Sequence, residues 1–308
     1  MVRQFAAEKL TAQQPGGTPG DTPDGTSDES RAVRARYSAY FLQLLAARAP
    51  DLKGSAPQMT LPTLRADLDN IRQAWQWAVA VCQVDEIAAA LDGLARLYDL
   101  TSLFAEGASV FGQAAADLAA CAGDSRALVG RLWVEQARLL NRRGLAEQGA
   151  QLMPRAVAVA QAIGDVGLEA LACYQWGDAL VFLGQPVQAQ ARLEKALALA
   201  RTAGLPIIEA ETLRHLGNCR AYQGDAAGAV LAYYAAQTCF RSLHERRGEG
   251  EVLNNLASFQ QRRGLWGEAA ANYELALRIF AELGYRWGQE AVLNNLGTLH
   301  HDLGHYVE

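Results

Sequence analysis

The chain repeats one pattern of small residues at a step of forty positions, and this period restricts its fold more than any other feature. The segment Leu253–Ala257 (LNNLA) is matched forty positions later by Leu293–Gly297 (LNNLG). The small residue that closes each segment recurs at the earlier steps, as Ala137, Gly177, Gly217, Ala257 and Gly297. A glycine follows each of them seven positions later: Gly144, Gly184, Gly224, Gly264 and Gly304. A fixed period of about 20 to 50 residues is typical of a stacked-repeat protein.

Between these glycines, the apolar residues recur with the period of an α-helix. After Gly264, the residues Ala269, Tyr273, Ala276 and Phe280 are three or four positions apart, which places them on one helix face. The two preceding units repeat this spacing. Each unit is therefore expected to be a helix, a tight turn at the glycine and a second helix packed against the first. A left-handed residue should end each unit, at Gly123, Gly164, Gly204, His244 and Gly284.

This spacing of small, aromatic and glycine positions resembles the tetratricopeptide repeat (TPR) family from about Ala88 to the C-terminus. The resemblance is most specific in the four units from Ala137 to Gly297. The period exceeds the usual length of about 34 residues, which is similar to the long repeats of kinesin light chains and of maltose-activator-type bacterial regulators. The resemblance implies an all-α fold, a right-handed α-solenoid of helix-turn-helix repeats preceded by a short helical adaptor.

The sequence divides into four expected segments. Residues 1–10 resemble the last helix of a winged-helix domain, and 11–29 form a Gly- and Pro-rich disordered linker. Residues 30–84 form the helical adaptor, with helices over Ser30–Ala47 and Leu64–Cys82. Residues 85–308 form the superhelix, and its last repeat is incomplete.

The adaptor carries a second resemblance. Its segment Leu64–Ala78 is similar to the junction helix that follows the winged helix in bacterial STAND (NB-ARC-type) ATPases and antibiotic-regulator-like transcription factors. The residues that carry this resemblance are Asp67, Asn70, Ile71, Arg72, Ala74, Trp77 and Ala78. It implies that the chain is the C-terminal sensor region of a larger signalling protein, downstream of nucleotide-switch domains.

Composition and charge exclude several classes of function. The formal net charge is −5, so a basic footprint for nucleic acid is absent. None of the three lysines follows a glycine, which excludes a phosphate-binding loop and an ATPase core. The most apolar stretch, Ala78–Ala105, carries five charged residues, too many for a membrane span. We expect a cytoplasmic location, with no contact to nucleic acid or membrane.

Five widely spaced cysteines without a C-x-x-C pair indicate buried thiols in a reducing compartment, not a disulfide framework or a zinc site. His300, His301 and His305 are interpreted as repeat residues, because Gly304 ends the helix between the last two. No nucleophile stands beside a base, and no cofactor loop is present. The sequence therefore predicts no enzyme, no metal and no cofactor.

In a stack of helix pairs, the first helix of each pair lines the concave side, and the TPR resemblance implies that its inward positions bind the ligand. The candidate ligand-binding residues are Arg138, Tyr174, Gln175, Asp178, Arg214, His215, Asn218, Asn254, Asn255, Asn294 and Asn295. Only Arg214 matches the cationic position of a carboxylate clamp, so an acidic C-terminal tail is not the expected ligand. The arginines fit either an anion site or a solvated helix face.

The paired asparagines allow two interpretations. Asparagine is a poor helix former, because its side chain competes for backbone hydrogen bonds. Asn254-Asn255 and Asn294-Asn295 either hydrogen-bond an extended peptide in the groove or bond the neighbouring helix and order the stack.

The sequence favours a non-enzymatic region that binds a protein or peptide. Two alternatives stay open: a small-molecule sensor, with Tyr174, Phe182 and Tyr222 as its aromatic candidates, and a homo-oligomerisation module.

Overall fold

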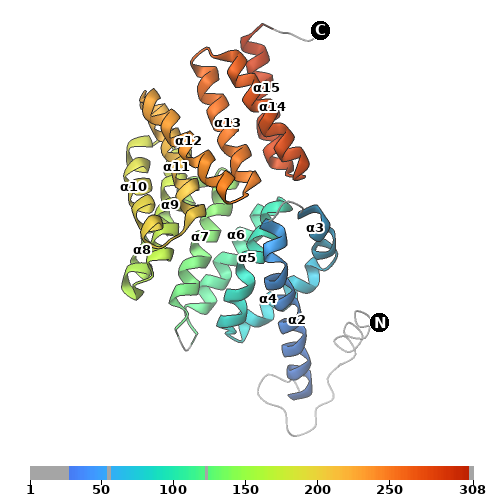
Figure 1. Cartoon of the computed structure of the whole chain (residues 1–308). Coiled ribbons are helices and arrows are strands. Elements are labelled where there is room, and N and C mark those ends of the chain that lie inside the picture. The colour runs from blue at the N-terminus through green and yellow to red at the C-terminus, as the bar shows by residue number, and fades with distance from the viewer. Residues whose placement is uncertain (1–27, 54–56, 122–123, 305–308) are drawn as a thin grey trace.

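The computed structural model describes residues 28–53, 57–121 and 124–304. Within these residues the chain forms helices α2 to α15 and no strand (Figure 1). The N-terminal helices are α2 (Asp28–Lys53), α3 (Pro57–Ala66) and α4 (Leu68–Ala80). The repeat helices are α5 (Val84–Leu100), α6 (Phe104–Leu118), α7 (Arg126–Arg142), α8 (Ala146–Ile163), α9 (Val166–Phe182), α10 (Pro186–Thr202), α11 (Pro206–Tyr222), α12 (Ala226–Ser242), α13 (Arg246–Arg262), α14 (Trp266–Glu282) and α15 (Arg286–Asp302).

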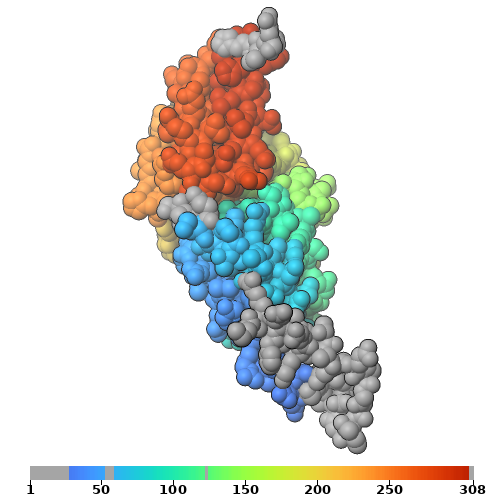
Figure 2. Space-filling view, turned by 90° about the vertical axis from the view of Figure 1, so that its right-hand side faces the viewer, coloured from blue at the N-terminus to red at the C-terminus, as the bar shows by residue number. Residues whose placement is uncertain are grey.

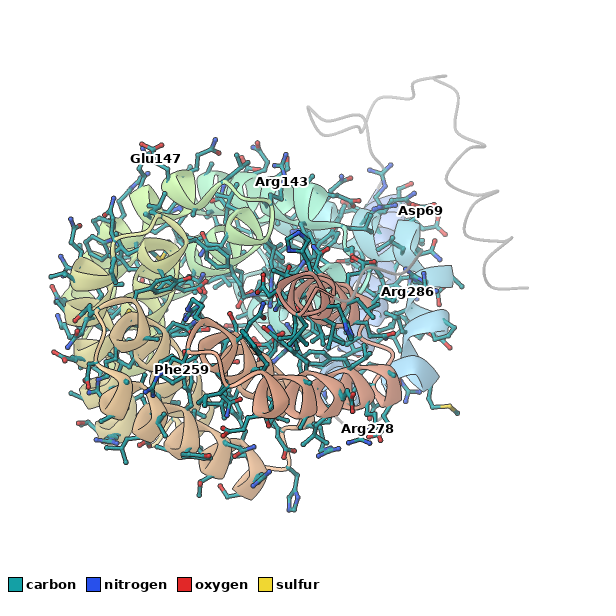
Figure 3. The ribbon with its side chains drawn as sticks, turned by 90° about the horizontal axis from the view of Figure 1, so that it is seen from above. Asp69, Arg143, Glu147, Phe259, Arg278 and Arg286 are labelled. Carbon is teal, nitrogen blue, oxygen red and sulfur yellow. A yellow bond between two sulfur atoms is a disulfide. The ribbon has the colours of Figure 1, made fainter. Side chains whose placement is uncertain are left out.

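The helices pair as the forty-residue period predicts. Helices α7, α9, α11, α13 and α15 each begin forty residues after the previous one, and each packs against the helix that follows or precedes it. These first helices also contact the first helix of the next unit, so they form the inner wall of a curved stack, and the second helices lie outside (Figure 3). The predicted all-α solenoid is confirmed.

Left-handed residues end the helices where the sequence predicts them. The turn glycines Gly144, Gly184, Gly224, Gly264 and Gly304 have φ between 68° and 83°. His244 (φ 54°) takes the same conformation at the end of α12. The first unit has no turn glycine, and Ser102 (φ 58°) adopts the left-handed conformation there, which the sequence pattern did not reveal. Gly123 lies outside the described residues.

The recurring small residue lets two helices approach closely. Gly177 and Gly217 occupy the same place in α9 and α11, as predicted. A Cβ atom at Gly177 would lie 2.5 Å from Cγ of Leu193, and one at Gly217 would lie 2.6 Å from Cε1 of Tyr233. Such contacts are far shorter than van der Waals distance, so a larger residue would force the hairpin apart. The aromatic knobs of the second helices, including Tyr233 and Phe280, are buried.

The adaptor differs from its expected form at several points. Helix α2 begins at Asp28, inside the expected linker, and extends past Ala47 to Lys53, and α3 begins at Pro57 instead of Leu64. The predicted helix Leu64–Cys82 is divided at Asp67, so that α3 ends at Ala66 and α4 begins at Leu68. Asp67 is 7% exposed, and its carboxylate accepts a hydrogen bond from Nδ2 of Asn70 (3.2 Å). Arg72 donates to both carboxylate oxygens of Glu106 on α6, which ties the adaptor to the first repeat. The expected winged-helix remnant (1–10) and nearly all of the linker lie outside the described residues.

The cysteine prediction is wrong for two of the five residues. Cys82 and Cys121 form a disulfide, with Cα atoms 6.1 Å apart and a sequence separation of 39. This separation is close to one repeat, so the chain segments after α4 and after α6 become neighbours when the units stack. Cys173 and Cys219 are buried free thiols, as predicted. None of the helices in the described part of the chain is long and apolar enough to cross a membrane.

The disulfide should stabilise the chain mainly by restricting its unfolded state. Closing a loop of this length contributes about 2–4 kcal/mol to the free energy of unfolding. We expect Cys82→Ser to lower that free energy by this amount, measured by urea denaturation of the oxidised protein. Cys239→Ser, at a free and half-buried cysteine, is the matched control. Equal midpoints for wild type and Cys82→Ser would contradict the prediction.

Candidate functional site

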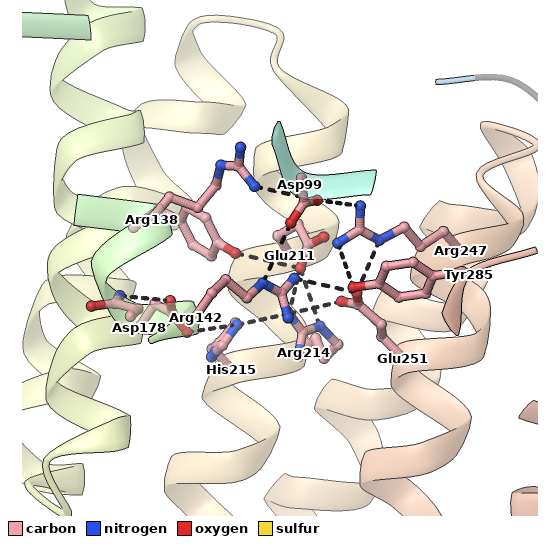
Figure 4. A network of polar contacts seen from close by, with 12 residues as sticks. Asp99, Arg138, Arg142, Asp178, Glu211, Arg214, His215, Arg247, Glu251 and Tyr285 are labelled. Atoms are coloured by element: carbon pink, nitrogen blue, oxygen red, sulfur yellow. Dashed lines mark hydrogen bonds and ion pairs between the residues drawn. The ribbon is translucent and has the colours of Figure 1, made fainter. Parts of the chain in front are cut away.

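The inner wall carries a dense cluster of charged and polar side chains (Figure 4). They project from the first helices of successive units, because residues forty positions apart occupy equivalent places in the stack. We call these residues the inner cluster: Asp99 on α5, Arg138 and Arg142 on α7, Asp178 on α9, Glu211, Arg214 and His215 on α11, Arg247 and Glu251 on α13, and Tyr285 before α15. Tyr174 on α9 also belongs to it, because its hydroxyl contacts Glu211 and its ring packs against His215.

Asp99 is the first centre of the inner cluster. Its side chain is 1% exposed and forms ion pairs with Arg247 (2.8 Å), Arg138 (3.3 Å) and Arg142 (3.8 Å). Burial alone would raise the pKa of Asp99, but the surrounding guanidinium groups outweigh burial and hold the pKa well below its usual range. Asp99 is therefore an ionised carboxylate held by three arginines.

Glu251 is the second centre. Its carboxylate lies 3.2 Å from Arg247, 3.3 Å from Arg214 and 3.8 Å from Arg142. Burial opposes its ionisation, but the three arginines outweigh burial and lower the pKa of Glu251. Arg214 also pairs with Glu211 of its own helix (2.7 Å). Arg142 and Arg247 thus join the two carboxylates into one network.

His215 and Asp178 form a part of the cluster in which burial disfavours the charged forms of both side chains. Nε2 of His215 lies 3.4 Å from Oδ1 of Asp178, whose Oδ2 accepts hydrogen bonds from Asn141 (3.0 Å) and Gln175 (3.1 Å). Burial, with Arg214 and Arg142, holds the pKa of His215 well below its usual value, so the imidazole is neutral. Burial raises the pKa of Asp178. Nδ1 of His215 and Oδ1 of Asn141 are buried and have no hydrogen-bond partner among the described residues.

The structure brings together six of the eleven candidate residues of the sequence analysis. Arg138, Tyr174, Gln175, Asp178, Arg214 and His215 all lie in or against the inner cluster. Their role in binding a ligand stays a prediction.

The asparagines lie apart from that cluster. Asn218 accepts a hydrogen bond from the hydroxyl of Tyr233 within its own unit (2.8 Å). Nδ2 of Asn295 donates to Oδ1 of Asn254 in the preceding unit (2.9 Å), a contact that matches the stack-ordering interpretation. Asn294 is exposed, and Nδ2 of Asn255 is buried without a partner among the described residues.

Sequence reasoning missed several members of the wall. Asp99 lies in the first unit, where the period slips from forty to forty-two and no glycine marks the turn. Arg96 could have been found, because Arg96 and Arg138 each lie four residues before the end of their helix. Arg247 and Trp287 could have been found in the same way, because they lie one period apart at equivalent positions of α13 and α15. The aromatic candidates Phe182 and Tyr222 are 58% and 64% exposed at helix ends, away from Tyr174.

Contacts between side chains nearly half the sequence apart close the wall on itself. Arg247 pairs with Asp99, 148 residues earlier, and also donates to the hydroxyl of Tyr285 (2.9 Å). The guanidinium of Arg142 lies 4.0 Å above the ring of Trp287. Figure 2 shows the red C-terminal units beside the blue and cyan N-terminal helices. The first and last units therefore meet, and the curved stack is closed.

No metal site emerges from the part of the chain that the structure describes, where no group of three or more His, Cys, Asp or Glu side chains is placed to hold an ion. His300 and His301 are exposed near the end of α15, and His305 lies outside the described residues.

Comparison with known proteins assigns the fold. No protein-family profile matches the chain, and no curated protein does. Among solved structures, a Rap protein complexed with Competence and Sporulation Factor is 12% identical, with a TM-score of 0.58, over 86% of this chain and 81% of that one. A STAND protein with a tetratricopeptide repeat sensor from Pyrococcus horikoshii is 15% identical, with a TM-score of 0.51, over 87% of this chain and 43% of that one. BtubC (BKLC) from P. vanneervenii is 17% identical, with a TM-score of 0.50, over 78% of this chain and 91% of that one. The chain has the fold of a TPR superhelix, with long repeats of forty residues.

The charge of Asp99 should make folding sensitive to acid. Because its pKa is lowered on folding, its stabilising contribution is present above about pH 4, the range of an unfolded Asp, and is lost as pH falls below it. We expect Asp99→Asn to lower the free energy of unfolding at pH 7 by about 3 kcal/mol and the difference from wild type to shrink toward pH 3. Urea denaturation across this range measures both quantities. Asp85→Asn, on the exposed start of α5, is the matched control. A difference in free energy of unfolding between wild type and Asp99→Asn that does not change with pH would contradict an ionised Asp99.

Proposed function

We propose that this chain is a non-enzymatic sensor and scaffold region that binds a protein or peptide on the inner wall of its superhelix. The observation that carries the proposal is the inner cluster itself. Arg138, Arg142, Arg214 and Arg247 keep between 11% and 23% of their side chains exposed, so guanidinium groups line the wall. Guanidinium groups in fixed orientation suit carboxylates and backbone carbonyls of a peptide.

Two similar structures support the same proposal. The Rap protein was solved with Competence and Sporulation Factor bound, and the Pyrococcus horikoshii protein is described as a signal transduction ATPase with a tetratricopeptide repeat sensor. By analogy, this chain would be the sensor of a larger STAND-type ATPase or transcription regulator. A bound ligand would act on upstream nucleotide-switch domains through its different affinity for two states.

The proposal places the chain in the cytoplasm, with no cofactor, nucleic acid or membrane as partner. The formal charge of −5 supports the exclusion of nucleic acid. The Cys82–Cys121 disulfide is the observation that opposes a cytoplasmic location, because reducing compartments keep most thiols free.

Homo-oligomerisation is a second candidate, favoured by one observation. Leu253 of α13 is 2% exposed, whereas its equivalent on α15, Leu293, is 54% exposed. Among the described residues no second helix covers this face of α15, so another copy of the chain could. Light scattering after size-exclusion chromatography tests this candidate, and a strict monomer at high concentration would exclude it.

Peptide binding is tested with a phage-displayed library of random peptides selected on the immobilised chain. We expect selected peptides to lose about tenfold or more in affinity for Arg214→Ala, because a hydrogen bond to a charged group is removed. Binding isotherms of the purified peptides give this ratio.

Arg278→Ala, an exposed arginine on α14 (Figure 3), is the matched control and should bind as wild type. Thermal denaturation checks that both variants are folded. Peptides that bind Arg214→Ala as tightly as wild type, or a library without any binder, would contradict the proposal.

A further inference from the structure

The place where the first and last units meet is built differently from the interfaces between successive units in the described part of the chain. Successive units share packed apolar cores that run from α2–α7 through to α13–α15. Across the meeting place, Leu100 is the one described hydrophobic residue that packs against both the N-terminal and the C-terminal core. Helices α5 and α13 are not among the pairs whose backbones pack extensively. Long side chains span the distance instead.

Four contacts make this junction, which we call the seam. They are the ion pairs Asp99–Arg247 and Arg142–Glu251, the stacking of Arg142 on Trp287, and the apolar contact of Leu100. The arginines are 15% and 17% exposed and Asp99 is 1% exposed, so the seam pairs are partly buried. Salt screens such pairs less than exposed ones, so only high salt is expected to weaken them.

Two further opposite charges, Arg96 and Glu245, face the seam and attract each other without a direct ion pair or hydrogen bond. Neither Arg96 of α5 nor Glu245 at the start of α13 forms an ion pair or side-chain hydrogen bond with any described residue. Burial lowers the pKa of Arg96 and raises the pKa of Glu245, so the closed arrangement disfavours the charged forms of both. Opening the seam would return both groups to water. Closure is therefore favoured by the pairs of Asp99 and Glu251. The burial of Arg96 and Glu245 opposes closure, and their mutual attraction offsets this only in part.

We propose that the seam is an electrostatic latch, and that the superhelix exchanges between a closed ring and an open spiral in which every helix stays folded. A solenoid allows this exchange because each unit contacts only its neighbours, and small rotations between units add up along the stack. Opening breaks the Asp99–Arg247 and Arg142–Trp287 contacts and exposes the inner wall. The latch does not require a ligand. That it controls access to the inner wall is the only step that rests on the proposed function.

The latch is tested by pulsed electron paramagnetic resonance distances between spin labels at Asp69→Cys and Arg286→Cys. These exposed positions, on α4 and at the start of α15, lie on opposite sides of the seam (Figure 3). Cys239 is replaced by serine, and the buried Cys173 and Cys219 stay unlabelled. We expect one short distance at low salt and a growing long-distance component at 1 M NaCl, where the screening length falls to about 3 Å.

Arg247→Ala should raise the ratio of the long to the short component about tenfold or more at low salt, because a charge-assisted hydrogen bond is lost. Arg247→Lys keeps the charge and should keep most of the short component, and Arg278→Ala should match wild type. Circular dichroism should show unchanged helicity, which separates opening from unfolding.

A distance distribution that changes neither in salt nor in Arg247→Ala would overturn the latch. If Arg247→Ala does not fold, the salt titration of the wild-type background decides alone. These measurements contain no ligand, so a failed latch leaves the peptide-binding proposal standing, and a failed peptide selection leaves the latch standing.

Discussion

The close approach of two helices at one small residue per unit determines the rest of this structure. At Gly177 and Gly217 the neighbouring second helix leaves no room for a Cβ atom, so the two helices of a hairpin lie in direct contact. A left-handed glycine seven residues later reverses the chain with little strain. Because a small residue and a left-handed glycine recur every forty residues from Ala137 to Gly304, the hairpins have nearly the same shape, and similar shapes stack with similar rotation. The curvature that brings the first unit to the last follows from this repetition.

Curvature has a chemical consequence for the side chains on its inner side. Helices that converge on one axis bring their inward residues together, and here those residues are mainly arginine, aspartate and glutamate. Isolated charges in such surroundings would be strongly disfavoured. The inner cluster avoids this at its two centres because each central carboxylate is shared: Asp99 pairs with three arginines, and so does Glu251. Removal of one partner leaves the others with an uncompensated charge, which is why such networks are sensitive to single substitutions.

The sequence predicted the parts of this molecule that depend on local pattern. The hairpins, the turn glycines, the left-handed His244 and the buried aromatic knobs all follow from three- and four-residue spacing within a forty-residue period. The sequence did not predict the contacts between distant units, because no single repeat shows how far one unit is rotated relative to the next. The pairing of Asp99 with Arg247 depends on the sum of these rotations. The sequence therefore located the wall residues of α7 to α11 but not the closure of α13 onto α5. The Cys82–Cys121 disulfide is an intermediate case. Its separation of 39 residues is almost one period, so stacking geometry could have suggested it.

A wall that satisfies its own charges constrains any ligand that binds there. A peptide must replace existing ion pairs of Arg142, Arg214 or Arg247, so its affinity depends on how readily these arginines exchange partners. If the wall is accessible only in a minor state, the apparent affinity falls by the fraction of that state. A ligand that fits the open wall would then gain affinity with every change that weakens the seam. Ligand binding and closure of the ring would be linked through Arg142 and Arg247, which belong both to the inner cluster and to the seam. If the proposed ligand binds there, that double membership is a physical route by which it would change the shape of the whole stack.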